Sequence, residues 1–185
     1  MTITVGINGF GRIGRATLAH ISESLRNDIK VVKVNATGPI ETAAHLMRYD
    51  SVHGRFAHPI TVEGNTMDLG RGPVQMFSTY DMNELDWDGV DVVLECTGNF
   101  NDGAKAKTHL ERGARKVLIS APAKNVDRTV VYGVNHQDLT AEDVIVSNAS
   151  CTPNCLAPVV KVIHEAMKTP VQSITTSTPS SGSAL

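Results

Sequence analysis

The sequence predicts an α/β fold built on a doubly wound parallel sheet. Short apolar runs rich in β-branched residues recur along the chain, helical stretches separate them, and a glycine-rich turn follows the first run. The runs occupy residues 2–8, 30–35, 91–97, 116–121 and 143–148. Ligands of such sheets bind outside the carboxyl ends of the strands, so we expect the functional residues at that edge.

The first helix is expected directly after the glycine-rich turn, with a small residue where helix and sheet approach closely. The residues predicted on its inner face are Gly14, Leu18, Ile21 and Leu25. Further helices are predicted over residues 39–49 and 102–112. Pro39 suits a first helical turn, because its missing N–H would have no partner there.

The middle and the end of the chain depart from this alternation. Residues 56–69 contain two extended segments around Gly64 and Asn65, which predicts a small β-hairpin inserted into the pattern. Residues 129–134 are a further strand candidate. Residues 175–185 are rich in Ser, Thr, Pro and Gly, and a frayed tail is expected there.

Composition limits the classes of protein to which the chain can belong. Hydrophobic residues make up 41% and charged residues 19%, the profile of a soluble globular protein. With 17 basic and 19 acidic side chains the formal charge is −2, which provides no basic surface for nucleic acid. No apolar run reaches the length of a membrane span, and the first residues lack a secretory signal pattern. A cytoplasmic protein is therefore expected.

Gly9, Gly11 and Gly14 form a G-x-G-x-x-G pattern between the first strand and an amphipathic helix. Glycines permit the tight turn, and the free N–H groups and positive dipole of the helix then face a pyrophosphate. We therefore predict a Rossmann domain that binds a nicotinamide dinucleotide. The alternative is a turn that holds no ligand.

The second strand ends in Val34-Asn35-Ala36-Thr37, where dinucleotide-binding domains normally carry an acid that binds the adenine ribose. Without that carboxylate the site does not repel a 2′-phosphate, and the Thr37 hydroxyl is available to donate to it. The prediction is a site that accepts NAD or NADP. The alternative is that Ala36 only weakens NAD binding, since no nearby arginine favours NADP.

A second candidate site lies at the start of the last predicted helix. Residues 156–167 have helical character, and Ser150 is the expected cap. Cys151 would then lie in the first turn, where free N–H groups stabilise a thiolate and create a nucleophile. Cys155 is expected to pack inward from the helix, and Cys96 is expected to be a structural thiol in a strand.

The cysteines and histidines do not indicate a metal site. The two helix cysteines have no further Cys or His at a suitable spacing, so we expect neither a metal centre nor a redox pair. The seven histidines are scattered along the chain. Surface positions are expected for His45, His53, His109 and His164.

Several motifs together resemble glyceraldehyde-3-phosphate dehydrogenases. They are GINGFGRIGR, RYDSVHGRF, ECTGNF, VLISAPAKN and the segment SNASCTPNCLAP, and the similarity covers residues 1 to about 167. The resemblance implies an N-terminal NAD(P)-binding Rossmann domain and a phosphorylating aldehyde oxidoreductase of glycolysis or carbon metabolism. In that reaction a cysteine attacks the aldehyde, hydride passes to the nicotinamide, and inorganic phosphate cleaves the resulting thioester to an acyl phosphate.

The resemblance also implies roles for individual residues. Cys151 would be the nucleophile, and Ser150 and Thr152 would help to bind the phosphate and aldehyde groups of the substrate. The backbones of Arg12 and Ile13 would hold the pyrophosphate. The residues on the nicotinamide side would be Thr97, Gly98 and Ser120.

The domains expected from the resemblance are a Rossmann domain over residues 1–150, a cysteine helix over residues 151–168 and a truncated or altered tail over residues 169–185. The catalytic domain of the family is expected to be missing. The family histidine of the motif T-T-x-H, which acts as the base, falls in register on Thr178. General base catalysis contributes about 10² to 10⁴ in rate, so negligible turnover by this chain alone is expected.

One departure lies beside the predicted nucleophile. The family pattern is C-T-T-N-C, whereas Pro153 replaces the second threonine here. Proline removes a hydroxyl and an amide proton and biases Thr152 away from helical geometry, so the turn around Cys151 is expected to be altered.

Three functions remain open. In the first interpretation the chain belongs to an aldehyde-oxidising enzyme that acts on glyceraldehyde 3-phosphate or on erythrose 4-phosphate. Inorganic phosphate would be a second substrate of the complete enzyme. Alternatively, it is a dinucleotide-binding module without chemistry. In the third interpretation it is an assembly module that uses an exposed apolar groove to associate with a full-length partner or with itself.

Overall fold

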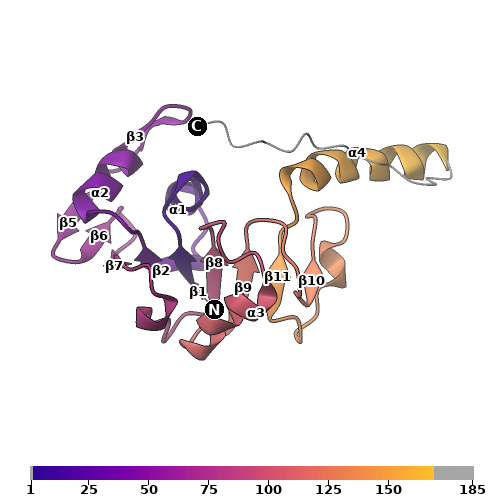
Figure 1. Ribbon diagram of the computed structural model, residues 1–185. Helices are drawn as coiled ribbons and strands as arrows, with labels where there is room; N and C mark the ends of the chain where they lie inside the picture. Colours follow the sequence, from indigo (N-terminus) through magenta and orange to yellow (C-terminus); the bar gives the residue numbers. More distant parts are fainter. Residues whose placement is uncertain (1, 169–185) are drawn as a thin grey trace, which may run out of the picture.

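The computed structural model describes residues 2–168, in which helices and strands alternate along the chain (Figure 1). The elements are β1 (Ile3–Asn8), α1 (Arg12–Glu23), β2 (Ile29–Asn35), α2 (Ile40–Arg48), β3 (Tyr49–Asp50), β4 (Gly54–Arg55), β5 (Thr61–Glu63), β6 (Thr66–Asp68), β7 (Pro73–Phe77), η1 (Met82–Glu84), β8 (Val92–Glu95), α3 (Gly103–Glu111), β9 (Lys116–Ile119), β10 (Arg128–Thr129), η2 (His136–Asp138), β11 (Ile145–Ser147) and α4 (Cys151–Met167). The predicted tail and Thr178 lie outside the described residues.

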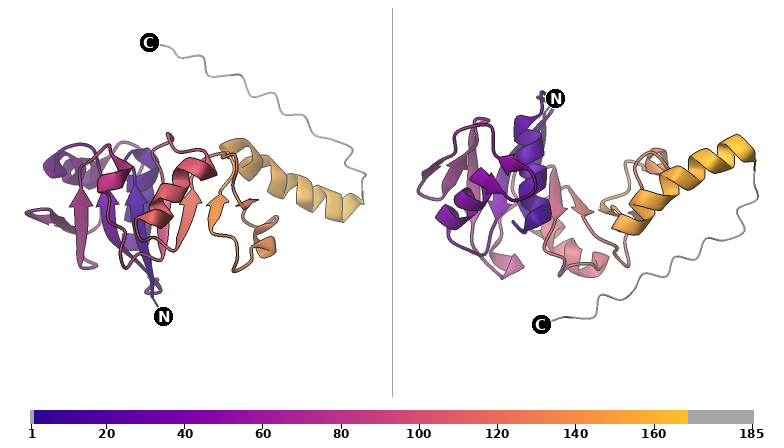
Figure 2. Two further views of the ribbon diagram at one scale, coloured as in Figure 1. Left: turned by 60° about the horizontal axis from the view of Figure 1, so that its bottom comes forward. Right: turned by 90° about the horizontal axis from the view of Figure 1, so that it is seen from above.

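A nine-stranded sheet with the order β10-β11-β9-β8-β1-β2-β7-β6-β5 forms the centre of the molecule. The strands from β10 to β7 are mutually parallel, and β6 is antiparallel to both β5 and β7. The helices α1 and α3 lie on opposite faces of the sheet (Figures 1 and 2). These observations confirm the predicted doubly wound α/β fold, and the pair β5–β6 is the predicted hairpin, with Gly64 at a φ of +54° in its turn.

The strand order places a switch point at β1. From β1 the chain moves through β2 to β7 on one side of the sheet, then returns to β8 and continues through β9 to β11 on the other side. Connections that leave β1 and β8 in opposite directions open a crevice above their carboxyl ends, which is where ligands of such sheets bind.

Helix α1 packs closely on the sheet through the residue predicted for that contact. A Cβ atom added to Gly14 would lie 2.1 Å from the carbonyl oxygen of Gly9, so only glycine fits there. Leu18 is almost fully buried in the same core. The prediction for Leu25 is wrong: α1 ends at Glu23, and the Leu25 side chain is 98% exposed.

Two other predicted boundaries change. Pro39 is the residue before α2 rather than part of its first turn. The strand expected over residues 129–134 shrinks to β10, because the chain turns at Val131, whose carbonyl oxygen accepts hydrogen bonds from the N–H groups of Val134 and Asn135.

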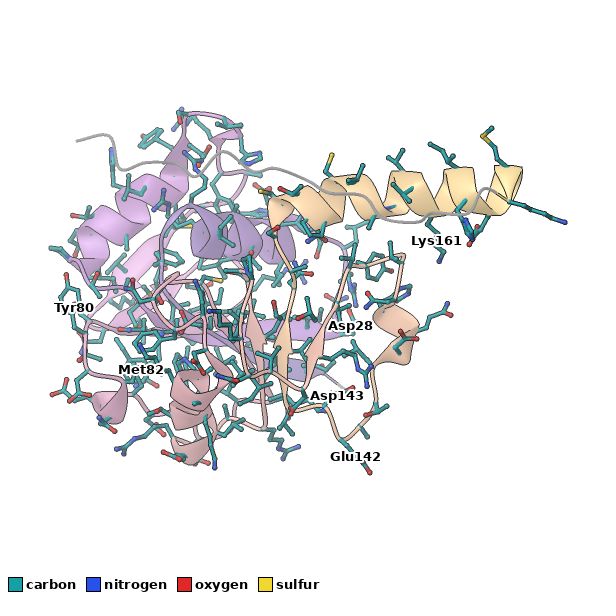
Figure 3. The ribbon with its side chains drawn as sticks, turned by 45° about the vertical axis from the view of Figure 1, so that its right-hand side comes forward. Asp28, Tyr80, Met82, Glu142, Asp143 and Lys161 are labelled. Atoms are coloured by element: carbon teal, nitrogen blue, oxygen red, sulfur yellow. The ribbon has the colours of Figure 1, made fainter. Side chains whose placement is uncertain are left out.

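The last helix, α4, extends away from the sheet (Figures 1 and 2), and none of its residues is buried. Its middle is held by Lys161, whose Nζ donates to the carbonyl oxygen of Gly133 at 3.0 Å (Figure 3). An apolar part of its surface is exposed, formed by Val159, Val162, Ile163 and Met167. Within residues 2–168, no helix is both long enough and apolar enough to cross a membrane.

Candidate functional site

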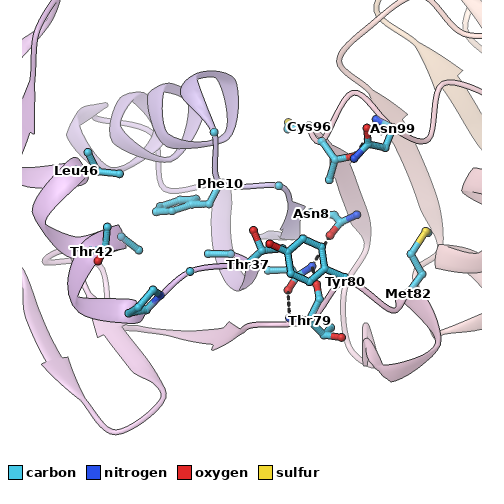
Figure 4. Close-up of a pocket in the computed structure, with 18 residues that line it drawn as sticks. Asn8, Phe10, Thr37, Thr42, Leu46, Thr79, Tyr80, Met82, Cys96 and Asn99 are labelled. Atoms are coloured by element: carbon cyan, nitrogen blue, oxygen red, sulfur yellow. Dashed lines mark hydrogen bonds between the residues drawn. The ribbon is translucent and has the colours of Figure 1, made fainter. Parts of the chain in front are cut away.

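A pocket of about 380 Å³ lies over the carboxyl ends of β1, β2, β7 and β8, at the switch point of the sheet. Figure 4 shows Thr42 and Leu46 on one side of the pocket and Cys96 and Asn99 on the other. The complete lining consists of Asn8, Gly9, Phe10, Gly11, Asn35, Ala36, Thr37, Gly38, Pro39, Thr42, Ala43, Leu46, Thr79, Tyr80, Met82, Cys96, Thr97 and Asn99.

The pocket brings together several residues that the sequence predicts for the cofactor. Those that line it are Gly9, Gly11, Asn35, Ala36, Thr37 and Thr97. Those that do not line it are Arg12, Ile13, Gly14, Gly98 and Ser120. Of the second group, Arg12, Ile13 and Gly14 form the first turn of α1 directly beside the pocket, and Gly14 packs on the sheet.

The glycine-rich turn has the shape that a phosphate cradle needs. Gly9 has a φ of +96°, and a Cβ there would lie 2.7 Å from the backbone nitrogen of Thr97. At Gly11 an added Cβ would meet nothing within 4 Å, so the pocket is open at this residue. Gly11 precedes α1 and supplies no side-chain cap, and no acid lies in the first turn. The N–H groups at the start of α1 therefore remain available to an anion.

Among residues 2–168, no charged side chain lines the pocket. The nearest candidate, Arg12, pairs with Asp50 instead, and hydrogen bonds from Arg12 and from the backbone of His53 and Val52 hold the pKa of Asp50 well below its usual range. Ala36, at the end of β2, brings no carboxylate to the pocket, as the sequence indicates. The lining is therefore neutral toward a ribose 2′-phosphate, neither repelling it nor pairing with it.

A row of hydrogen-bonded side chains crosses the sheet beneath the pocket. The amide nitrogen of Asn35 donates to Asn8 Oδ1 at 2.8 Å, and the amide nitrogen of Asn8 donates to Glu95 Oε2 at 2.6 Å. Asn35 also binds Thr79, accepting from its backbone N–H and donating to its carbonyl oxygen. At the other end, Glu95 Oε1 accepts from the backbone N–H and the hydroxyl of Thr97.

His109, which was predicted to lie at the surface, is buried next to Glu95 in this row. His109 is fully buried on α3, and its Nε2 lies 2.9 Å from Glu95 Oε2 while its Nδ1 accepts a hydrogen bond from Trp87 Nε1 at 2.9 Å. Burial by itself would raise the pKa of Glu95, but hydrogen bonds from His109, Thr97 and Asn8 outweigh that effect and lower it. Glu95, an acid inside the apolar run 91–97, is the sequence signal for this group, because an unpaired acid is costly in a buried strand.

The predicted nucleophile lies at the start of α4, outside the pocket. Cys151 is exposed and occupies the first position of the helix, and Ser150 precedes it. Neither Cys151 nor its predicted helpers Ser150 and Thr152 line the pocket. The structure therefore places the cradle and the thiol at the same edge of the sheet but does not join them in one cavity.

The turn around Cys151 is organised by a residue that sequence analysis did not select. Ser150 occupies the predicted N-cap position, but its side chain makes no capping hydrogen bond. Instead, the amide nitrogen of Asn154 donates to the carbonyl oxygens of Asn148 at 2.7 Å and Ser150 at 2.9 Å. The disturbance expected from Pro153 is also not observed, because α4 runs through it from Cys151 and a first-turn proline forfeits no helical hydrogen bond.

The other two cysteines differ in their surroundings. Cys155 is exposed, so the prediction that it packs inward is wrong. Cys96 is half-buried immediately after β8 and lines the pocket, and burial raises the pKa of its thiol. Within residues 2–168, no group of three or more His, Cys, Asp or Glu residues is placed to hold a metal ion.

A family model described as the NAD binding domain of glyceraldehyde 3-phosphate dehydrogenase matches residues 3–103. The chain belongs to the glyceraldehyde-3-phosphate dehydrogenase family. This match confirms the family suggested by the motifs and shows that the Rossmann domain containing the pocket is an NAD-binding domain.

Curated members of the glyceraldehyde-3-phosphate dehydrogenase family are similar over most of this chain. The glyceraldehyde-3-phosphate dehydrogenase of Cereibacter sphaeroides is 56% identical over 167 residues, which are 90% of this chain and 50% of that protein. That of Xanthobacter flavus is 56% identical over 169 residues, with the same coverage. The chromosomal enzyme of Cupriavidus necator is 52% identical. The chain spans about half the length of these relatives.

Proposed function

We propose that the chain binds NAD or NADP across the carboxyl edge of its sheet. The pyrophosphate lies at the turn from Gly9 to Gly14, the adenine ribose lies at the end of β2, and the nicotinamide half extends over β8 toward Thr97, Gly98 and Ser120. The observation that carries this proposal is the open pocket at Gly11, where the free N–H groups at the start of α1 meet a lining without negative charge.

A Gly11→Ala substitution tests this placement. Gly11 has φ −73° and ψ −161°, which alanine adopts without strain, and its Cβ would meet no protein atom within 4 Å. We expect an unchanged melting temperature and an affinity for NAD lowered about tenfold or more, because the methyl group occupies the position where the phosphate approaches the backbone. Calorimetric titration measures the affinity. Unchanged affinity in Gly11→Ala would contradict the placement of the pyrophosphate.

The proposed acceptance of NADP depends on Ala36. An Ala36→Asp variant is expected to lose affinity for NADP about tenfold or more relative to NAD, because the new carboxylate repels the 2′-phosphate and accepts from the ribose hydroxyls. Ala36→Asn is the matched control, since it has the same size without the charge. Titrations of both variants with both cofactors separate the two effects. An equal loss of NADP binding in both variants would assign the effect to size instead.

We further propose that Cys151 is the nucleophile of a phosphorylating aldehyde oxidation in a complete enzyme, with Ser150 and Thr152 next to the bound substrate. The substrate is a small phosphorylated aldehyde, glyceraldehyde 3-phosphate or erythrose 4-phosphate, and inorganic phosphate is the acceptor. Support comes from the exposed thiol at the first position of α4, where free N–H groups stabilise negative charge on sulfur.

Alkylation rates test the special position of Cys151. Cys155 is a control on the same helix, because it is equally free and exposed but lies one turn further from the helix start. We expect iodoacetamide to modify Cys151 about two to five times faster than Cys155, from a helix-terminus effect of about 0.3–1 kcal/mol. Mass spectrometry of peptides over time measures both rates. Faster modification of Cys155 would argue against the proposed role.

For this chain we expect dinucleotide binding without aldehyde oxidation, since Cys151 does not line the pocket. Aldehyde-dependent formation of NAD(P)H that Cys151→Ser abolishes would contradict this expectation.

A non-catalytic assembly role is the second candidate, favoured by the exposed apolar residues of α4. Self-association of two copies through that face would make sedimentation depend on concentration, and Val162→Asp would abolish the dependence.

A further inference from the structure

The hydrogen-bonded row beneath the pocket has a single direction. The backbone N–H of Thr79 donates to Asn35, Asn35 donates to Asn8, and Asn8 donates to Glu95. Rotating the side-chain amide of Asn35 or Asn8 by 180° would place an acceptor against an acceptor and a donor against a donor. For Asn35 this is so because its nitrogen also donates to the Thr79 carbonyl oxygen. The row therefore requires a hydrogen-bond acceptor at its end, opposite the amide nitrogen of Asn8.

The Glu95 carboxylate meets that requirement completely. One oxygen accepts from the Thr97 N–H and hydroxyl, and the other accepts from Asn8 and faces His109 Nε2. Four donors match the accepting capacity of an ionised carboxylate. Trp87 donates to His109 Nδ1, which places the imidazole proton on Nε2, so His109 donates to Glu95 as well.

The two ends of the row lie in two different loops, and both loops line the pocket. Thr79 follows β7, next to Tyr80, and Thr97 follows β8, close to Asn99. In the proposed binding mode, the first loop lies on the adenosine side and the second on the nicotinamide side. One buried carboxylate is thus hydrogen-bonded, directly or through two amides, to the backbone on both sides.

We propose that Glu95 is the positioning residue of the dinucleotide pocket, orienting both loops through the row Thr97–Glu95–Asn8–Asn35–Thr79. The expected effect of this inference on the affinity for NAD rests on the proposed function. The ordering of the two loops is a property of the chain alone and is testable without a ligand.

Substitution of Glu95→Gln removes the acceptor at one oxygen while preserving size. The new amide then opposes either the Thr97 donors or the Asn8 and His109 donors, so the row is interrupted at Thr97 or at Asn8. The expected results are an affinity for NAD lowered about tenfold or more and amide hydrogen exchange raised about tenfold or more at Thr97 or at Thr79, measured relative to Val117 in β9. Val117 is the reference because its N–H donates to the carbonyl oxygen of Val144, and neither residue belongs to the row.

Trp87→Phe is the matched structural control. It removes the donor to His109 Nδ1 in the same buried group but leaves all four donors of Glu95 in place. We expect a lower melting temperature in this variant, with affinity for NAD and relative exchange at Thr97 and Thr79 retained within about twofold. If affinity and exchange at Thr97 or Thr79 change in Trp87→Phe as much as in Glu95→Gln, the role is merely structural and the proposal fails.

Asn8→Ala keeps the proposal testable if Glu95→Gln does not fold. It interrupts the row in the middle, so relative exchange at Thr79 is expected to rise about tenfold while Thr97, still bound to Glu95, stays protected. Unchanged Thr79 exchange in Asn8→Ala would overturn the proposal. Failure of the unaltered chain to bind NAD or NADP would overturn the proposed function, and the exchange data would still decide whether Glu95 orders both loops.

Discussion

Replacing Gly14 by alanine is expected to destabilise the fold by about 3 kcal/mol, although alanine normally stabilises a helix interior by up to about 1 kcal/mol relative to glycine. The sign reverses because the new Cβ would lie 2.1 Å from the carbonyl oxygen of Gly9 and 3.1 Å from Ile7 Cγ2. Neither neighbour can yield easily, since Gly9 belongs to the turn and Ile7 is fully buried in β1. Helix α1 would have to move away from the sheet.

Urea unfolding measures this effect, with Gly11→Ala as the control three residues earlier in the chain. At Gly11 the added methyl group meets no protein atom within 4 Å, so the unfolding midpoint should remain unchanged. A Gly14→Ala protein as stable as the unaltered chain would show that the contact between α1 and β1 is less close than described.

Replacing His109 by leucine is expected to lower the free energy of unfolding by about 3–5 kcal/mol. The substitution leaves the buried Glu95 carboxylate without one of its donors and leaves Trp87 Nε1 without its acceptor. Both groups are fully buried, so water does not replace the lost partners. His45→Leu, at an exposed histidine of α2, is the control and should change stability by less than about 0.5 kcal/mol.

The pH dependence of the same variant has a predictable sign. Because the folded protein lowers the pKa of Glu95, its carboxylate contributes stability above its unfolded pKa of about 4.3, and that contribution is lost as the pH falls through the lower folded value. Without His109 the folded pKa rises and the contribution shrinks. The stability difference between the two proteins should therefore narrow below about pH 4, and denaturant unfolding from pH 7 to pH 3 measures it. A difference that is constant over this range would argue against an ionised Glu95.

The features that sequence analysis predicted depend on local spacing. The glycine-rich turn, the parallel strands and the hairpin at Gly64 each follow from residues within one or two elements, and each is present in the structure. The absence of a carboxylate at Ala36 could be predicted in the same way, because in dinucleotide-binding domains the residue at the end of the second strand normally binds the adenine ribose.

The features that sequence analysis missed depend on partners far apart in the chain. Asn8 and Glu95 are 87 positions apart, and Trp87 and His109 are 22 apart, so neither spacing nor polarity reveals that they meet. His109 was expected at the surface because it lies in a polar, helical stretch of the sequence, but two buried partners offset the cost of its burial. Cys155 was expected to be covered, and which face of α4 is covered depends on tertiary contacts that helical spacing does not contain.

Helix α4 forms a long arm that projects from the sheet and has Pro158 in its interior. Its 17 residues span about 25 Å, so a tilt of about 10° near Cys151 displaces the far end by about 4 Å. Two hydrogen-bonding side chains set that angle: Asn154 at the pivot and Lys161 along the arm. A small change of backbone geometry beside Cys151 is thereby amplified into a displacement of the exposed apolar residues at the opposite end, including Met167.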